Sequence, residues 1–122
     1  MKRDIKDRGD INEVVNLFYE KVKTDDIIGF FFSEVVVVNW EKHLPKMCDF
    51  WENVLFYTGN YEGDPLMTHR NIHQKHSTSP HHFERWMQLF VESVDELYKG
   101  VNAEKMKTHA KGIAEVMMER LG

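Results

Sequence analysis

The chain has 122 residues, of which 42% are hydrophobic and 30% are charged, which predicts one folded domain over residues 1–122. A formal net charge of −4 argues against a nucleic-acid-binding protein, since such proteins need a basic surface. The only cysteine is Cys48, and no apolar run is long enough for a secretory signal or a bilayer span, so we expect a cytoplasmic protein without membrane insertion.

The first elements are a long helix and a short aromatic-rich piece. The helix is expected to start at Asp10, with Glu13 three residues later completing an acidic cap. Its apolar stripe comprises Ile11, Val14, Val15, Phe18 and Val22. Gly29 interrupts the aromatic piece at 25–32. The run 35–38 favours a strand by propensity but has no partner strand, so we interpret it as an irregular or helical lead-in.

A second long helix is predicted over about residues 40–57. Its apolar face comprises Trp40, Leu44, Met47, Phe50, Trp51, Val54 and Leu55. Pro45 lies inside this pattern, and because proline fits best in the first turn, the regular helix is expected to begin near His43. Glycine, asparagine and proline then mark a loop at 58–65, and one or two helical turns are expected at 66–72.

Two further long helices complete the predicted all-α fold. Ser79 and Pro80 predict the cap and first residue of a helix that ends near Gly100. Its inward residues are Phe83, Trp86, Met87, Phe90, Val94 and Leu97. Asn102 is expected to cap the last helix. The inward residues of that helix are Met106, Ala110, Ile113, Met117 and Leu121.

Histidines cluster in one part of the sequence. Five of the seven fall within residues 69–82, namely His69, His73, His76, His81 and His82. His69 and His73 are four residues apart and would share a helix face, which leaves a zinc site open, although the chain has neither a thiolate pair nor an HExxH motif. A neutral imidazole within apolar walls is also what haem iron needs. Spacing does not choose the ligand, and the composition fits a filled helical core as well as a core around a flat cofactor.

Five sequence segments resemble one known family in the same order, over roughly residues 11–120. They are Phe18-Tyr19-Glu20-Lys21-Val22; Gly29 followed by aromatics; Trp40-x-x-His43-Leu44-Pro45-Lys46-Met47 with Phe50-Trp51; Tyr61-x-Gly63-x-Pro65-Leu66-x-x-His69; and Phe83-x-x-Trp86-x-x-Leu89-Phe90. Together they resemble the group III truncated haemoglobins. The resemblance implies a truncated globin-like two-over-two helical sandwich that encloses one haem b, iron protoporphyrin IX.

The resemblance also implies roles for individual residues. His69 matches the iron ligand, with His73 as its nearest rival, while Tyr19, Trp86 and His43 match the distal side that faces a bound gas. A phenolic O–H and an indole N–H can both donate hydrogen bonds there. Cofactor contacts are expected from Phe31, Phe32, Met47, Phe50, Trp51, Phe90, Arg70 and His76, the last two as candidate partners of the haem propionates.

Several functions are compatible with these residues. The resemblance implies reversible binding of a diatomic gas (oxygen, NO or CO), as in oxygen transport. An NO dioxygenase or a peroxidase-like enzyme, served by a reductase, is an alternative because a polar distal pocket helps both reactions. A gas or redox sensor and a haem-free helical metal-binding or interaction module also stay open.

Overall fold

The structure, a computed structural model, describes residues 2–29, 40–57 and 80–121. Within these ranges the regular elements are four α-helices, with no strand among them. The helices are α1 (Arg8–Lys23), α2 (Trp40–Phe56), α4 (Pro80–Leu97) and α5 (Val101–Leu121). The all-α prediction is therefore confirmed, and the elements expected within 30–39 and 58–79 lie outside the described residues.

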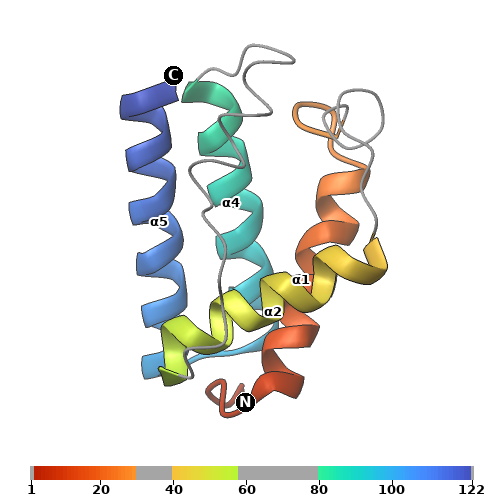
Figure 1. Cartoon of the computed structure of the whole chain (residues 1–122), viewed down its shortest axis with the longest axis vertical. Coiled ribbons are helices and arrows are strands. Elements are labelled where there is room, and N and C mark those ends of the chain that lie inside the picture. The colour runs from red at the N-terminus through yellow and green to blue at the C-terminus, as the bar shows by residue number, and fades with distance from the viewer. Residues whose placement is uncertain (1, 30–39, 58–79, 122) are drawn as a thin grey trace.

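The four helices pack as two pairs. In Figure 1, α4 and α5 run antiparallel along one side, α1 runs antiparallel to α4, and α2 crosses in front of the others. The helix pairs in contact are α4 with α5, α1 with α2, α1 with α4, and α2 with α5. This arrangement is the predicted two-over-two sandwich. None of these helices is both long and apolar enough to cross a membrane.

The core is built from the apolar stripes that the sequence predicts. All five stripe residues of α1, from Ile11 to Val22, are buried. In the middle of the molecule, Phe18 of α1 meets Phe90 of α4 edge to face, with ring centroids 5.2 Å apart. Trp51 of α2 stacks on the same Phe90 at 4.8 Å. Large aromatic side chains thus join three helices at one point.

The start of α1 differs from the prediction. The helix begins at Arg8, and its N-cap is Asp7, whose carboxylate accepts a hydrogen bond from the Asp10 backbone N–H at 3.1 Å. Asp10 is instead buried inside the first turn, where Arg3 donates to its two carboxylate oxygens at 2.6 and 2.7 Å. The predicted Asp10 cap is wrong because Asp7 caps the helix and the Asp10 carboxylate binds Arg3 instead. Glu13 likewise accepts a hydrogen bond from Tyr98, 2.5 Å away.

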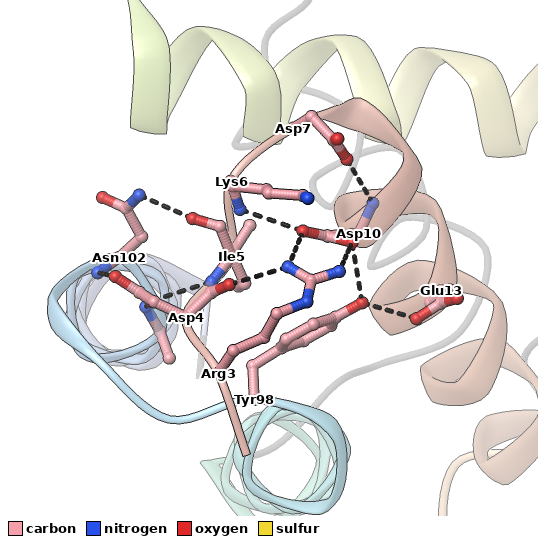
Figure 2. Close-up of polar contacts among 10 residues, drawn as sticks. Arg3, Asp4, Ile5, Lys6, Asp7, Asp10, Glu13, Tyr98 and Asn102 are labelled. Carbon is pink, nitrogen blue, oxygen red and sulfur yellow. Dashed lines mark hydrogen bonds and ion pairs between the residues drawn. The ribbon is translucent and has the colours of Figure 1, made fainter. Parts of the chain in front are cut away.

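The N-terminal residues tie α1 to the turn between α4 and α5, and Figure 2 shows this cluster, which we call the N-terminal clamp (Arg3, Asp4, Asp10, Tyr98 and Asn102). Asp4 caps α5, since its two oxygens accept hydrogen bonds from the backbone N–H groups of Asn102 and Ala103, both at 2.9 Å. The predicted Asn102 cap is therefore wrong, because the Asn102 side chain donates to the Ile5 carbonyl instead.

Helix α2 also begins earlier than predicted. It starts at Trp40 and contains Pro45, although the sequence suggested a start near His43. Arg8 of α1 crosses to this helix, donates to the Pro45 carbonyl at 3.2 Å and forms an ion pair with Asp49 at 2.6 Å. Contacts with α1 thus support the helix around the proline, which lacks a backbone N–H of its own.

Candidate functional site

A buried tyrosine and a histidine form the most distinctive polar contact inside the helical sandwich. Tyr19 projects from α1 toward α2, is only 8% exposed, and its hydroxyl lies 2.8 Å from Nε2 of His43. The two rings meet edge to face with centroids 5.1 Å apart. An exposure of 8% shows that Tyr19 is not an ordinary surface residue of the helix. Two of the three predicted distal residues lie together.

The Tyr19–His43 pair has two hydrogen-bonding states. When Nε2 of His43 carries no proton, the phenol donates to it. When Nε2 carries a proton, the imidazole donates to the phenolic oxygen, and the phenolic hydrogen becomes available to a third partner. The pair can therefore offer a hydrogen-bond donor to a small polar ligand without leaving its own atoms unpaired.

Trp86, the third predicted distal residue, lies in the same aromatic cluster. Its indole ring meets Phe18 edge to face at 5.9 Å and stacks on Phe90 at 5.9 Å, with an angle of 15° between the planes. Phe18 also contacts Tyr19 at 4.9 Å. Tyr19 and Trp86 are thus neighbours of one phenylalanine. Among the described residues the Trp86 N–H has no hydrogen-bond partner.

The other residues predicted to contact a cofactor fall into two groups. Trp51 and Phe90 are buried at 4% and 1% exposure and pack on each other, while Met47 and Phe50 on α2 are partly buried against the same core. Outside the described residues lie His69, His73, Phe31, Phe32, Arg70 and His76. The structure therefore supports an apolar wall on α2 and α4.

An open cavity of about 970 Å³ lies along α5, with Phe50 of α2 at its edge. Its described lining is Phe50, Val101, Glu104, Lys105, Thr108, His109, Gly112, Ile113, Val116 and Met117. Ligand pockets usually measure about 300–1,000 Å³, so this cavity is large enough for a cofactor-sized molecule. Phe50 belongs both to this cavity and to the predicted cofactor wall.

His109 is a residue of this cavity that the sequence did not single out. Its ring lies 5.8 Å from those of Phe50 and Trp51. Burial, and then the nearby charge of Lys105, lowers the pKa of His109, so this imidazole is neutral at pH 7. No motif surrounds it, and only the packing of α5 against α2 reveals that it borders a cavity.

These features fit the requirements of a haem pocket, whereas the zinc candidates His69 and His73 lie outside the described residues. In the part of the chain that the structure describes, no three histidine, cysteine or acidic side chains gather in a way that could hold a metal ion. Haem needs only one imidazole from the protein, apolar walls and a few polar groups on the ligand side. The aromatic cluster and the Tyr19–His43 pair are groups of these kinds.

Comparisons with known proteins agree with this arrangement. Residues 5–120 match the model of the family described as bacterial-like globin. Over 101 residues the chain is 31% identical to the group 3 truncated hemoglobin ctb of Campylobacter jejuni, covering 80% of this chain and 77% of that protein. The crystal structure of group III truncated hemoglobin from Campylobacter jejuni superposes with a TM-score of 0.85 at 28% identity, covering 100% of this chain and 96% of the other.

Proposed function

Since the chain belongs to the bacterial-like globin family and its resemblance to group III truncated haemoglobins is confirmed, we propose that it binds one haem b, holds the iron through His69, and binds a diatomic gas reversibly. The observation that carries the proposal is the hydrogen bond of 2.8 Å between Tyr19 and His43. A polar pair buried among aromatic rings is costly unless its groups are paired, and this pair keeps a donor for a further ligand.

When bound, haem would supply an iron atom that can take a small gas molecule. The residues that would hold the ring are the apolar side chains of α2 and α4, namely Met47, Phe50, Trp51 and Phe90. Phe31 and Phe32 complete this wall in the proposal, and Arg70 and His76 pair with the propionates. Such walls exclude water from the pocket, which strengthens each hydrogen bond formed inside it.

The distal residues determine how long a gas stays. Oxygen accepts hydrogen bonds in the pocket, and we assign the donors as the Tyr19 hydroxyl and the Trp86 indole N–H. His43 controls the first donor, because the phenolic hydrogen can turn toward the gas only when the imidazole donates to the phenolic oxygen. Tyr19 and Trp86 both contact Phe18, which places the two proposed donors in the same aromatic cluster.

His69→Ala tests the proposed iron ligand. The variant is expected to lose haem, or to lose the five-coordinate ferrous spectrum, because no imidazole remains on that side of the iron. Free imidazole should restore the spectrum by taking the place of the side chain. His73→Ala is the matched control and should leave the spectrum unchanged. If His69→Ala keeps its ligation and His73→Ala loses it, the assignment belongs to His73.

The same polar pair favours a second candidate function, an NO dioxygenase or a peroxidase-like enzyme. His43 can accept the phenolic proton of Tyr19, and reactions of this kind need proton transfer close to the bound ligand. Either activity needs a reductase as partner. Nitrate formed from NO by the oxygenated protein, or peroxide consumed with a reducing substrate, would favour the enzyme; oxygen release without either reaction would favour a carrier.

An oxygen-transport role and a cytoplasmic location are part of this proposal. The location rests on the chain's composition and on the haem chemistry, which needs a cellular reductant to keep the iron ferrous. Fractionation of cells that produce the protein should place it with the cytoplasmic proteins, and recovery with membranes or outside the cell would contradict the location.

A further inference from the structure

A largely buried ion pair joins the turn after α1 to the second turn of α4, next to Trp86. Arg85 donates from Nε to Asp25 Oδ1 at 2.8 Å, and its Nη2 lies 2.7 Å from the same oxygen. The Asp25 side chain is 4% exposed. On its other side, Arg85 Nη1 donates to the Gln88 side chain at 2.9 Å, so the guanidinium is held in one orientation.

The second oxygen of Asp25 shapes the turn itself. Asp25 Oδ2 accepts hydrogen bonds from the backbone N–H groups of Ile27 and Ile28 at 3.0 and 3.1 Å. The Asp25 carbonyl accepts from the Gly29 N–H, and a Cβ at Gly29 would lie only 2.5 Å from that carbonyl oxygen. One carboxylate therefore fixes a tight turn and links it to α4.

This ion pair differs from an ordinary surface contact. Burial raises the pKa of Asp25, but hydrogen bonds from Arg85 and from the two backbone N–H groups outweigh burial and hold that pKa below its usual value. The carboxylate is thus charged at neutral pH. Exposed ion pairs contribute little to stability, whereas removing one partner of a buried pair leaves an uncompensated charge.

Two neighbouring contacts hold α4 against α1 and the turn after it. They are the ion pair between Arg85 and Asp25 and the ring contact between Trp86 and Phe18. Arg85 and Trp86 are adjacent in α4, and their partners Asp25 and Phe18 both come from α1 and the turn that follows it. Because Phe18 and Phe90 fix the plane of the Trp86 ring, the position of α4 against α1 determines where the indole N–H lies.

We infer that Asp25 and Arg85 are positioning residues for Trp86, which set the indole N–H against the gas in the distal pocket. This inference rests on the proposed function in one respect, the donation from Trp86 to the gas. Neither residue touches the ligand; the pair acts by holding the turn after α1 against α4. A loosened pair lets the indole shift, and a hydrogen bond weakens steeply when its geometry is lost.

The test measures oxygen release from the haem-loaded protein by stopped-flow displacement with CO. Trp86→Phe should speed release on the order of 5- to 150-fold, the range for one lost hydrogen bond. Asp25→Asn and Arg85→Lys should each speed release at least about twofold but not beyond Trp86→Phe. Arg85→Lys keeps the positive charge but loses the planar guanidinium, whose Nε and Nη2 both contact Asp25, so it is the milder variant. In a protein that already carries Trp86→Phe, Asp25→Asn should not change the oxygen release rate further.

Glu96→Gln is the matched control, because Lys21 of α1 and Glu96 of α4 also form an ion pair, at 3.0 Å. Glu96 is 54% exposed, and its loss should leave oxygen release unchanged. The inference is overturned if Asp25→Asn and Arg85→Lys release oxygen at the wild-type rate. It is also overturned if Asp25→Asn has the same effect with and without Trp86, because the pair then acts only on general stability.

A second measurement separates this inference from the proposed function. The indole N–H resonance of Trp86 in the apoprotein, assigned with Trp86→Phe, should shift in Asp25→Asn and Arg85→Lys but not in Glu96→Gln. If the wild-type protein takes up no haem, the proposed function fails while the resonances still report the positioning. If the resonance stays in place in both variants, the positioning inference fails whatever the haem content.

Discussion

Tyr19 illustrates how a distant residue decides the role of a side chain. Within α1 its position follows the buried Phe18 and could equally face solvent, so periodicity alone favours a surface residue. Only the packing of α2 against α1 brings His43 to 2.8 Å from the hydroxyl. The family resemblance predicted both residues as distal, and the structure places them in contact.

Tyr19→Phe should speed oxygen release from the haem-loaded protein on the order of 5- to 150-fold, because one hydrogen bond worth about 1–3 kcal/mol is lost. The measurement is the dissociation rate by stopped-flow mixing with CO. Tyr57→Phe is the control, since Tyr57 is 79% exposed and its hydroxyl accepts from Lys105 away from the distal pair. A wild-type rate in Tyr19→Phe would leave Trp86 as the sole donor.

Some residues at the site carry no signal in the sequence. His109 stands among polar residues of α5, and Asp25 and Arg85 are sixty positions apart. No spacing rule links such residues, because their contacts depend on how the helices cross. The distal roles proposed for Tyr19, Trp86 and His43 come from the family resemblance, whereas the contact between Tyr19 and His43 required the folded chain.

For single helices, the sequence predicted which residues are helical better than it predicted where each helix begins and how it is capped. The apolar stripes of α1 and α4 predicted their buried faces, and Pro80 is the first residue of α4 as expected. The caps were mispredicted because the side chains expected to form them bind other partners. Asp10 binds Arg3, and Asp4, about a hundred residues away in sequence, caps α5.

The Asp4 cap predicts a measurable loss of stability. Asp4→Ala should lower the free energy of unfolding by about 1 kcal/mol, within the usual 0.5–2 kcal/mol for a lost N-cap, because two backbone N–H groups of α5 lose their acceptor. Urea unfolding followed by far-UV circular dichroism measures the change. Glu115→Ala, an exposed position on the same helix, should change it little. Equal effects of both substitutions would contradict the cap.

Gly100 belongs to the same turn and shows why the clamp needs a glycine. Its φ is 154°, and a Cβ there would lie 2.4 Å from Cγ of Asp4. The carboxylate can therefore reach the start of α5 only because residue 100 has no side chain. The sequence predicted Gly100 as the end of the preceding helix, which is consistent with its place in the turn, but not its part in the cap.

For the molecule as a whole, helix periodicity was sufficient to predict an all-α protein, and the family resemblance added the two-over-two arrangement. Apolar residues at three- and four-residue spacing mark the buried face of a helix, so helices can be predicted without knowledge of the contacts between them. The crossing of α2 over the other helices comes from side-chain packing between distant segments, which periodicity does not encode. This crossing creates the Tyr19–His43 contact and brings Phe50 to the edge of the cavity along α5.

The buried carboxylates predict an acid-sensitive fold. Arg3 holds the pKa of Asp10 well below its usual value, and backbone hydrogen bonds lower that of Asp4 despite its burial. Because the folded pKa values lie below the unfolded ones, the stabilisation is complete above the unfolded pKa of about 4 and is lost as the pH falls further. The free energy of unfolding should therefore decrease progressively below pH 4.

Urea unfolding between pH 7 and pH 3 measures this dependence. Asp4→Asn removes one of the titrating groups, so the free energy of unfolding should depend less steeply on pH. Asp7→Asn is not a suitable control, because Asp7 caps α1. Glu119→Gln, on an exposed position of α5, is the better control and should keep the wild-type slope. A wild-type stability that is constant from pH 7 to pH 3 would contradict the role of these carboxylates.

The absorption spectrum of the purified protein, reconstituted with haem and recorded in its ferric, ferrous and CO-bound forms, tests the central claim most directly. The account predicts one haem per chain and an intense Soret band that shifts on reduction and again on addition of CO. Circular dichroism of the same sample should show that the chain is helical. A helical, folded protein that gains no Soret band after reconstitution would contradict the account.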